Sequence, residues 1–261
     1  MRVGAGMALV LGLAALAGPG RAQEIVNPTW ASMPDGEAMM EAYPQFASMI
    51  ALEGDITLHC RVAVDGSLSL CRPVAVVPEG VGFDRAALDL ASSFRVNPRQ
   101  VDGAATKSSV QFTIRFRLEP VETPPPWTGP EPEPAHLSAV EAMFGKVRAF
   151  SGPMPIWDME GVDLQVDPDR DAAVRAMIQQ VEREWRDKSE AAAARAFARL
   201  LTPEQLRDIE AGRRWPPEPP EPLLSQAGDV IAEVAVAMEA RLKQLYCARY
   251  DCSARTPAPI I

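Results

Sequence analysis

Histidine is nearly absent from this sequence of 261 residues, which contains only His59 and His136. Two imidazoles cannot build a histidine-rich metal site or supply several general bases, so the commonest hydrolase and metalloenzyme designs are excluded. Basic side chains are outnumbered by acidic ones, 26 to 35, and the formal net charge of −9 would repel the phosphate backbone of a nucleic acid. The sequence therefore predicts a non-catalytic protein with no metal, no cofactor and no nucleic-acid partner.

Long apolar runs are also rare, and the longest lies at the N-terminus. The run from Val3 to Ala17 carries no charge and follows the basic Arg2. This pattern is typical of a secretory signal peptide, and the run is shorter than the roughly 18 to 20 residues that span a bilayer. We expect a signal peptide over residues 1–22, cleavage between Ala22 and Gln23, and a periplasmic mature protein. A retained helix that anchors the chain in the inner membrane is the alternative.

The four cysteines of an exported chain fall into two local pairs. A two-residue turn at Asp65-Gly66 would pair residues whose numbers sum to 131, which places Cys60 opposite Cys71. The apolar pattern of the second strand is offset by one residue, so a bulge near Pro73 is needed to reconcile the two registers. We predict a disulfide between these cysteines, with two separately buried thiols as the alternative.

The second pair, Cys247 and Cys252, lies near the C-terminus. Residues five apart on an unbroken helix point in different directions, so a disulfide here requires the helix to end near Cys247. The sequence is consistent with this bridge and, as the alternative, with two unbridged cysteines.

Residues 35–119 follow the order helix, hairpin, helix, strand. Alternation with period two runs from Ile56 to Val64, and a second strand is expected from Leu68 to about Val77. Apolar residues then recur at helical spacing from Phe83 to Phe94, and a half-solvated strand follows from Val110 to Leu118. We predict the α+β class, with a small antiparallel sheet and helices on one face.

A proline-rich linker and a helical domain complete the chain. Seven prolines between Pro120 and Pro134 predict a semi-rigid linker over residues 120–135. Residues 136–252 carry apolar stripes at helical spacing and are expected to form a separate all-α domain. The charged run from Asp187 to Glu190 is expected to break the first long helix of this domain.

Six short pieces of sequence between residues 35 and 118 carry a resemblance: Tyr43-Pro44, Gly54 to Leu58, Val64-Asp65-Gly66, Phe83 to Leu88, Pro98 and the strand Val110 to Leu118. In order and spacing they resemble the C-terminal domain of the TonB energy-transducer family. The resemblance implies a small sheet with helices packed on one face. It also implies a periplasmic domain that binds a short extended segment of an outer-membrane receptor beside its last strand. Residues 137–252 are faintly similar to helical periplasmic domains of unassigned function.

Carried over to this chain, the resemblance puts a partner segment along the last strand. Such β-augmentation uses the unpaired backbone groups of an edge strand for affinity and the neighbouring side chains for selectivity. The candidate partner-binding residues are Val110, Gln111, Thr113, Arg115 and Arg117. The two arginines favour an acidic or neutral segment. In the alternative, the strand only completes the sheet, and the arginines or the linker cover its edge.

Two functions are consistent with these features. A transducer of the TonB family needs a membrane helix and a proline-rich arm before its binding domain, whereas here the proline stretch comes after it. We therefore predict an exported protein that binds an extended segment of an envelope protein, with a membrane-anchored TonB-type energy transducer as the alternative. Catalysis by a cysteine–histidine pair is excluded, because His59 and Cys60 are neighbours on one strand and point to opposite faces.

Overall fold

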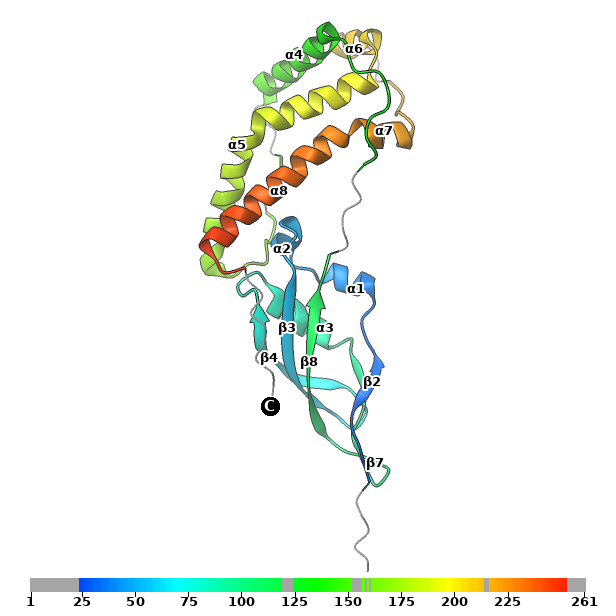
Figure 1. Ribbon diagram of the computed structural model, residues 1–261, viewed down its shortest axis with the longest axis vertical. Helices are drawn as coiled ribbons and strands as arrows, with labels where there is room; N and C mark the ends of the chain where they lie inside the picture. The colour runs from blue at the N-terminus through cyan, green and yellow to red at the C-terminus, as the bar shows by residue number, and fades with distance from the viewer. Residues whose placement is uncertain are drawn as a thin grey trace, which may run out of the picture.

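The chain forms an elongated molecule with a sheet at one end and a set of helices at the other (Figure 1). The computed structural model describes residues 24–118, 124–151, 156–157, 159, 161–213 and 216–252. The expected signal peptide, with its cleavage site at Ala22 and Gln23, lies outside the described residues. Within the described ranges, no helix is both long enough and apolar enough to cross a membrane.

The first part of the chain has the predicted order of helix, hairpin, helix and strand, with several short strands added. Its elements are β1 (Ile25–Val26), β2 (Thr29–Ser32), α1 (Gly36–Glu41), α2 (Gln45–Met49), β3 (Gly54–Val62), β4 (Leu68–Val77), α3 (Phe83–Ala91), β5 (Arg95–Asn97), β6 (Gln100–Val101), β7 (Ala104–Ala105) and β8 (Ser108–Phe116).

The main sheet has three antiparallel strands in the order β4-β3-β8. Its central strand β3 turns Ile56, Leu58 and Cys60 inward, and all three side chains are fully buried. Helix α3 covers this face, because its apolar residues recur at helical spacing and bury Phe83, Ala87 and Leu90. The predicted α+β class, with helices packed on one face of a small sheet, is confirmed.

The hairpin between β3 and β4 differs from the expected two-residue turn. Ala63 N–H donates to the Ser67 carbonyl at 3.0 Å, so the loop contains three residues, Val64, Asp65 and Gly66. Gly66 has φ +80°, and a Cβ at this position would overlap the Val96 carbonyl oxygen. The expected two-residue turn was therefore wrong. An Asp-Gly pair suits both a two-residue loop and a three-residue loop with glycine in the left-handed conformation, and the chain forms the second.

Strand β4 contains two bulges, and the first of them restores the register that pairs the cysteines. Near the loop, Val62 lies opposite Leu68, one residue away from the expected register. An irregularity at Leu70, which has φ +48°, brings the register back, so that His59 lies opposite Arg72. The predicted disulfide between Cys60 and Cys71 is therefore formed, with the two Cα atoms 4.1 Å apart. The second irregularity skips Val74, beside the position where a bulge was expected.

The short strands extend this part of the molecule beyond the main sheet. β2 pairs antiparallel with β5, and β1 pairs with β6, which in turn pairs with β7. Trp30 on β2 lies against Phe94 and Phe112, with ring centroids 5.3 and 4.9 Å away. The residues before position 35 are thus packed onto the same core, although no sequence pattern predicted strands there.

The second part of the chain contains helices joined by loops, and no strand lies among its described residues. Its elements are α4 (Pro134–Ser151), α5 (Pro168–Leu200), α6 (Pro203–Glu210), α7 (Glu221–Ala227) and α8 (Asp229–Arg249). The expected break between Asp187 and Glu190 is absent, because α5 continues through it. Glu190 pairs with Arg148 of α4 at 2.6 Å, so charge at this point is compensated by a neighbouring helix and does not end the helix.

A buried arginine joins the linker to the far end of the helical part. The Arg199 side chain of α5 is only 4% exposed and pairs with Asp229 at 2.5 Å and with Glu131 at 2.8 Å. Trp127 N–H donates to the same Asp229 carboxylate at 2.9 Å. The described end of the linker is therefore held against α5 and the start of α8.

The helical part packs on the end of the sheet part through one continuous apolar core. Phe46 of α2 lies against Tyr246 of α8, with ring centroids 5.1 Å apart and both side chains fully buried. The segment before α5 adds backbone contacts, since Phe46 N–H donates to the Leu164 carbonyl and Asp167 N–H to the Gly80 carbonyl. The sequence did not predict this contact between the two parts.

Candidate functional site

Strand β8 lies at an edge of the main sheet. It pairs with β3 from Gly54 opposite Phe116 to Val62 opposite Ser108, without a bulge. Within the described residues no strand pairs with its other side. The last strand thus ends at residue 116, two residues earlier than expected, and it has the edge position that strand addition requires.

The direction of the β8 backbone groups follows from the hairpin. Ala63 N–H points toward β4, since it donates to Ser67. Backbone groups alternate sides along a strand, so the odd-numbered residues of β3 face β4 and the even-numbered ones face β8. The even-numbered residues of β8 accordingly bond to β3. The N–H and C=O groups of Ser109, Gln111, Thr113 and Arg115 point to the open edge.

The even-numbered side chains of β8 face the core. Ile114 and Phe116 are buried, and the Phe116 ring lies 5.5 Å from Tyr43 and 5.2 Å from Phe83. Phe112 packs against Trp30 and Phe94. Val110, one of the predicted partner-binding residues, is half-buried on this same face and packs against the core. The strand is thus anchored along its whole length, while no strand of the described residues pairs with its outer edge.

The outward side chains of β8 differ in how far they are already engaged. Gln111 and Arg115 are exposed, whereas the Thr113 hydroxyl hydrogen-bonds the Thr57 hydroxyl at 2.9 Å. Just beyond the strand, Arg117 donates to the Asp55 carboxylate at 2.5 Å and to the Gly54 carbonyl at 3.1 Å. Arg115 therefore carries the available positive charge at this edge, and the charge of Arg117 is partly neutralised within the sheet.

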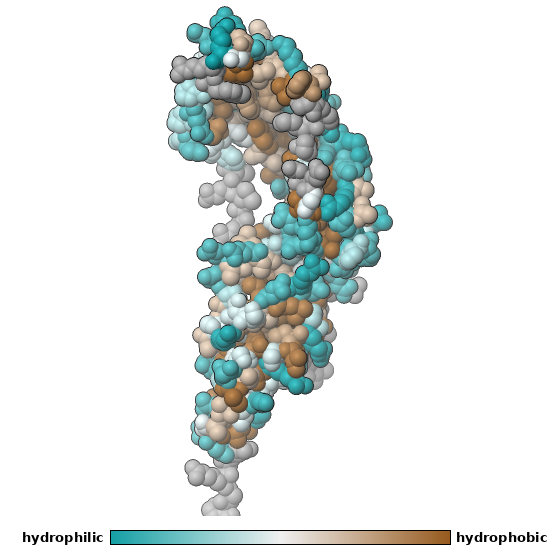
Figure 2. All heavy atoms as spheres, turned by 180° about the vertical axis from the view of Figure 1, so that it is seen from behind, coloured by the Kyte–Doolittle hydropathy of each residue, from teal (hydrophilic) through white to brown (hydrophobic). Residues whose placement is uncertain are grey.

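A groove of about 1180 Å³ opens beside the end of β8, and we call it the β8–α1 groove. One wall is residues 115–118 at and after the end of β8, and the other includes Met39 and Met40 of α1. Tyr43 and Leu52 add apolar surface, and α8 closes one end. Figure 2 shows the molecule from behind, where its outline is hollowed between the sheet part and the helical part.

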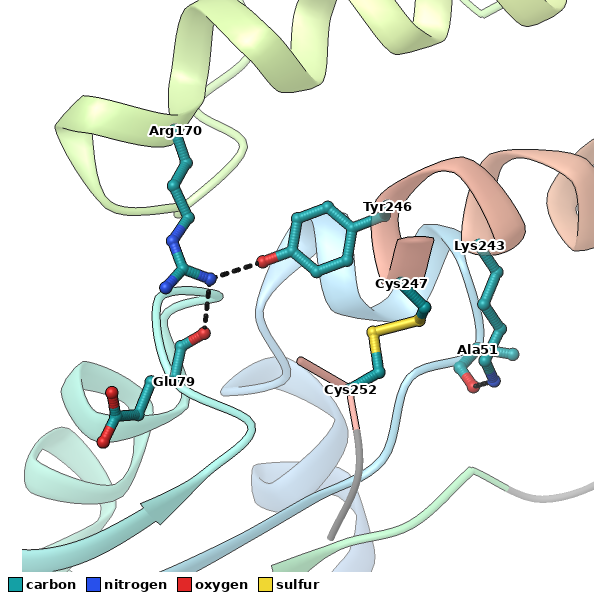
Figure 3. Close-up of a disulfide and its surroundings, with 7 residues drawn as sticks. All are labelled: Ala51, Glu79, Arg170, Lys243, Tyr246, Cys247 and Cys252. Atoms are coloured by element: carbon teal, nitrogen blue, oxygen red, sulfur yellow. Dashed lines mark hydrogen bonds between the residues drawn. A yellow bond between two sulfur atoms is a disulfide. The ribbon is translucent and has the colours of Figure 1, made fainter. Parts of the chain in front are cut away.

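The end of α8 is fixed against the sheet part by several contacts (Figure 3). Arg170 donates to the Glu79 carbonyl at 2.7 Å and to the Tyr246 hydroxyl at 2.8 Å. The disulfide that the sequence allowed between Cys247 and Cys252 is formed, because the helix ends at Arg249 and the chain then turns back. Cys252 itself lines the β8–α1 groove, so this bridge holds the end of the described chain beside the site.

Tyr43 in the wall of the groove predicts a loss of stability at alkaline pH. Its buried hydroxyl donates to the Leu52 carbonyl at 2.9 Å, and burial, together with the nearby Glu53 carboxylate, raises its pKa to about 12. Above the ordinary value near 10, the unfolded chain loses this proton while the folded chain keeps it. The free energy of unfolding should therefore fall as pH rises from 10 toward 12.

This loss is measurable by urea denaturation at pH 9 and pH 11. We expect Tyr43 to contribute about 1 kcal/mol of the decrease between these two values. In Tyr43→Phe the contribution of Tyr43 to the decrease should be absent. A smaller decrease should remain, because burial also raises the pKa of Tyr246. Equal decreases in the two proteins would contradict the assignment.

The histidines and cysteines show no nucleophile beside a base. Cys60 is bonded to Cys71, and His59 occupies the next position of β3, on the opposite face. A ring nitrogen of His136 lies 2.8 Å from the Leu201 carbonyl, which is a structural contact in the helical part. In the portion of the chain that the structure describes, no group of three potential ligands is placed to hold a metal. The absence of catalysis stays a prediction.

Sequence reasoning missed the groove and most of its lining. It named residues of β8 because alternation and resemblance both point to that strand. The α1 wall and the contributions of Glu239 and Lys243 come from segments about 75 residues before and 125 residues after β8. No periodicity in α1 or α8 distinguishes a groove-lining side chain from an ordinary surface one.

Comparison with protein families gives one match. Residues 40–118 match the family model described as Gram-negative bacterial TonB protein C-terminal. No curated protein matches the chain. The match confirms the resemblance for residues 40–118. Domains of this type belong to the Gram-negative cell envelope and serve protein–protein interaction. It covers residues from the end of α1 through β8 and does not extend into the helical part.

Proposed function

We propose that this protein is exported to the periplasm and binds an extended segment of an envelope protein, by adding that segment to the open edge of β8. An outer-membrane receptor of the TonB-dependent kind is one candidate partner. The observation that carries the proposal is the row of outward backbone groups at Gln111, Thr113 and Arg115, beside a groove of peptide dimensions. No catalytic step is part of this function.

The side chains at the edge favour an acidic or neutral segment. Arg115 is exposed and lies in none of the ion pairs among the described residues, and the protein as a whole is acidic. A carboxylate on the partner would pair with this exposed guanidinium. Because both groups are exposed, their attraction is screened over about 8 Å at physiological ionic strength, so affinity should weaken as salt is added.

A membrane-anchored TonB-type transducer is the second candidate function. It uses the same edge strand but keeps residues 1–22 as a membrane helix. The position of the proline-rich stretch favours the released form, since residues 124–133 run to the helical part and Glu131 pairs with Arg195 and Arg199 there. A segment held in this way is not a free arm that extends the binding domain across the periplasm.

The decisive experiment replaces one outward backbone donor of β8. Short random peptides displayed on phage are selected on the wild-type chain, and the affinity of the selected peptides is measured by fluorescence anisotropy. Thr113→Pro removes an outward N–H and leaves the bonds to β3 in place, so we expect affinity to fall about tenfold or more. Thr113→Val is the matched control, because it keeps the N–H and loses only the hydroxyl contact with Thr57.

Hydrogen exchange gives an independent readout of the same geometry. On peptide binding, the amides of Gln111, Thr113 and Arg115 should become protected, while those of Phe112 and Ile114 are already protected by β3. Circular dichroism must show that Thr113→Pro is folded. If a folded Thr113→Pro binds the peptides as tightly as Thr113→Val does, or if the outward amides exchange unchanged, the partner does not add to β8.

A further inference from the structure

Helix α8 brings two charged side chains, Glu239 and Lys243, to one end of the β8–α1 groove. They lie four residues apart and therefore on the same face of the helix. Lys243 is already engaged, because its Nζ atom donates to the Ala51 carbonyl at 2.7 Å (Figure 3). Glu239 has neither a hydrogen-bond partner nor an ion-pair partner among the residues that the structure describes.

An unpartnered, half-buried carboxylate is costly to keep charged. Burial raises the pKa of Glu239, which shows that its surroundings disfavour the charged form. A cation placed against it would compensate the lost hydration. None of the three cations that line the groove, Arg115, Arg117 and Lys243, forms an ion pair with Glu239. Arg117 is paired with Glu53 and Asp55, and Lys243 donates to a backbone carbonyl.

A partner segment that is added to β8 and continues past Phe116 enters the groove whose far end is lined by Glu239. The residues at and just after the end of β8, 115–118, line the same groove as Glu239. An extended chain advances about 3.3 Å per residue, so a partner needs only a few residues beyond Phe116 to reach the α8 wall. The groove thus continues the open edge of the strand and is walled there by the helical part.

We propose that α8 takes part in recognition: the end of the partner segment that runs past Phe116 carries a lysine or arginine, which pairs with Glu239. The inference rests on the proposed function, because it requires the segment to lie along β8. It assigns to the helical part a direct role in selecting the partner. The favoured segment is then acidic or neutral beside Arg115 and basic at the α8 end.

The test compares peptide selections on matched variants of the full chain. Peptides selected from the random library on wild type should share a Lys or Arg at one end. Glu239→Lys should lower the affinity of those peptides about tenfold, and Glu239→Gln about fivefold, which correspond to like-charge repulsion and to a lost half-exposed ion pair. Selection on Glu239→Lys should return peptides with Asp or Glu at the same position. Glu233→Lys is the control, because Glu233 is exposed on the same helix and does not line the groove.

The outcomes separate this inference from the proposed function. If peptides depend on Thr113 as expected but bind Glu239→Lys and Glu233→Lys equally well, strand addition stands and the role of α8 is refuted. Glu239→Lys could also reverse the charge of the selected peptides while Thr113→Pro still binds them as tightly as Thr113→Val. The groove would then select partners without strand addition, and both this inference and the proposed function would be refuted. If wild type selects no peptide above a scrambled background, both are overturned.

Discussion

Replacing Tyr246 by alanine should lower the free energy of unfolding by about 4 kcal/mol, because a fully buried aromatic ring leaves a cavity that the core cannot close. The ring contacts Phe46 at 5.1 Å and Tyr250 at 4.8 Å between centroids, and its hydroxyl accepts from Arg170. The substitution removes the central contact between the helical part and the sheet part. Urea denaturation followed by circular dichroism measures the change.

Tyr246→Phe is the matched control for this prediction. It keeps the ring and removes only the hydroxyl, while Arg170 retains its bond to the Glu79 carbonyl. A loss of about 1 kcal/mol is expected from one hydrogen bond. Similar losses in the two variants would mean that the hydroxyl, and not the packing of the ring, joins the two parts. A loss below about 1 kcal/mol in Tyr246→Ala would mean that the two parts do not share a core.

The double variant Cys60→Ala and Cys71→Ala is expected to unfold with a free energy lower by about 3 kcal/mol. The disulfide closes a loop with a sequence separation of 11, and the loop-entropy model gives roughly this value. Cys60 is fully buried in the core of β3, so its lost sulfur contacts add to the effect. Urea denaturation of both proteins under non-reducing conditions measures the difference.

Peptide mapping without reductant provides the control for the cysteine variant. It should recover Cys60 joined to Cys71, and Cys247 joined to Cys252, with no thiol that is open to alkylation. If wild type and the double variant have equal free energies of unfolding, the bridge does not constrain the unfolded chain. If alkylation labels both Cys60 and Cys71 in the folded wild-type protein, the pairing beside the bulge at Leu70 is incorrect.

Local patterns in the sequence were sufficient for the class of the fold and for most of its elements. Alternation between Ile56 and Val64 and the helical spacing after Phe83 are set by which side chains must be buried, and burial dominates the energy of both elements. The cysteine pairing was also predictable, since the hairpin brings Cys60 and Cys71 together over a short span. The loop length was not, because two- and three-residue loops at Asp65-Gly66 have nearly the same sequence signature.

The break expected near Asp187 shows where local reasoning fails in the helical part. Lysine and glutamate are good helix formers, and a run such as Asp187 to Glu190 stays helical where the tertiary structure compensates its charges. Arg148, about 40 residues earlier in the chain, supplies the partner of Glu190. A contact of this kind depends on how α4 and α5 pack together, and the spacing of residues within α5 carries no information about it.

The sequence alone determined that β8 would be a half-buried strand with its apolar residues facing the core and an arginine exposed at 115. Only the tertiary structure decided what lies beside that strand. The α1 wall, the end wall from α8 and the shared core around Phe46 and Tyr246 depend on how the elements pack in space. Packing joins side chains by shape and burial, irrespective of their distance along the chain. The half-buried strand was therefore readable from the sequence, whereas its unpaired edge and the groove beside that edge were not.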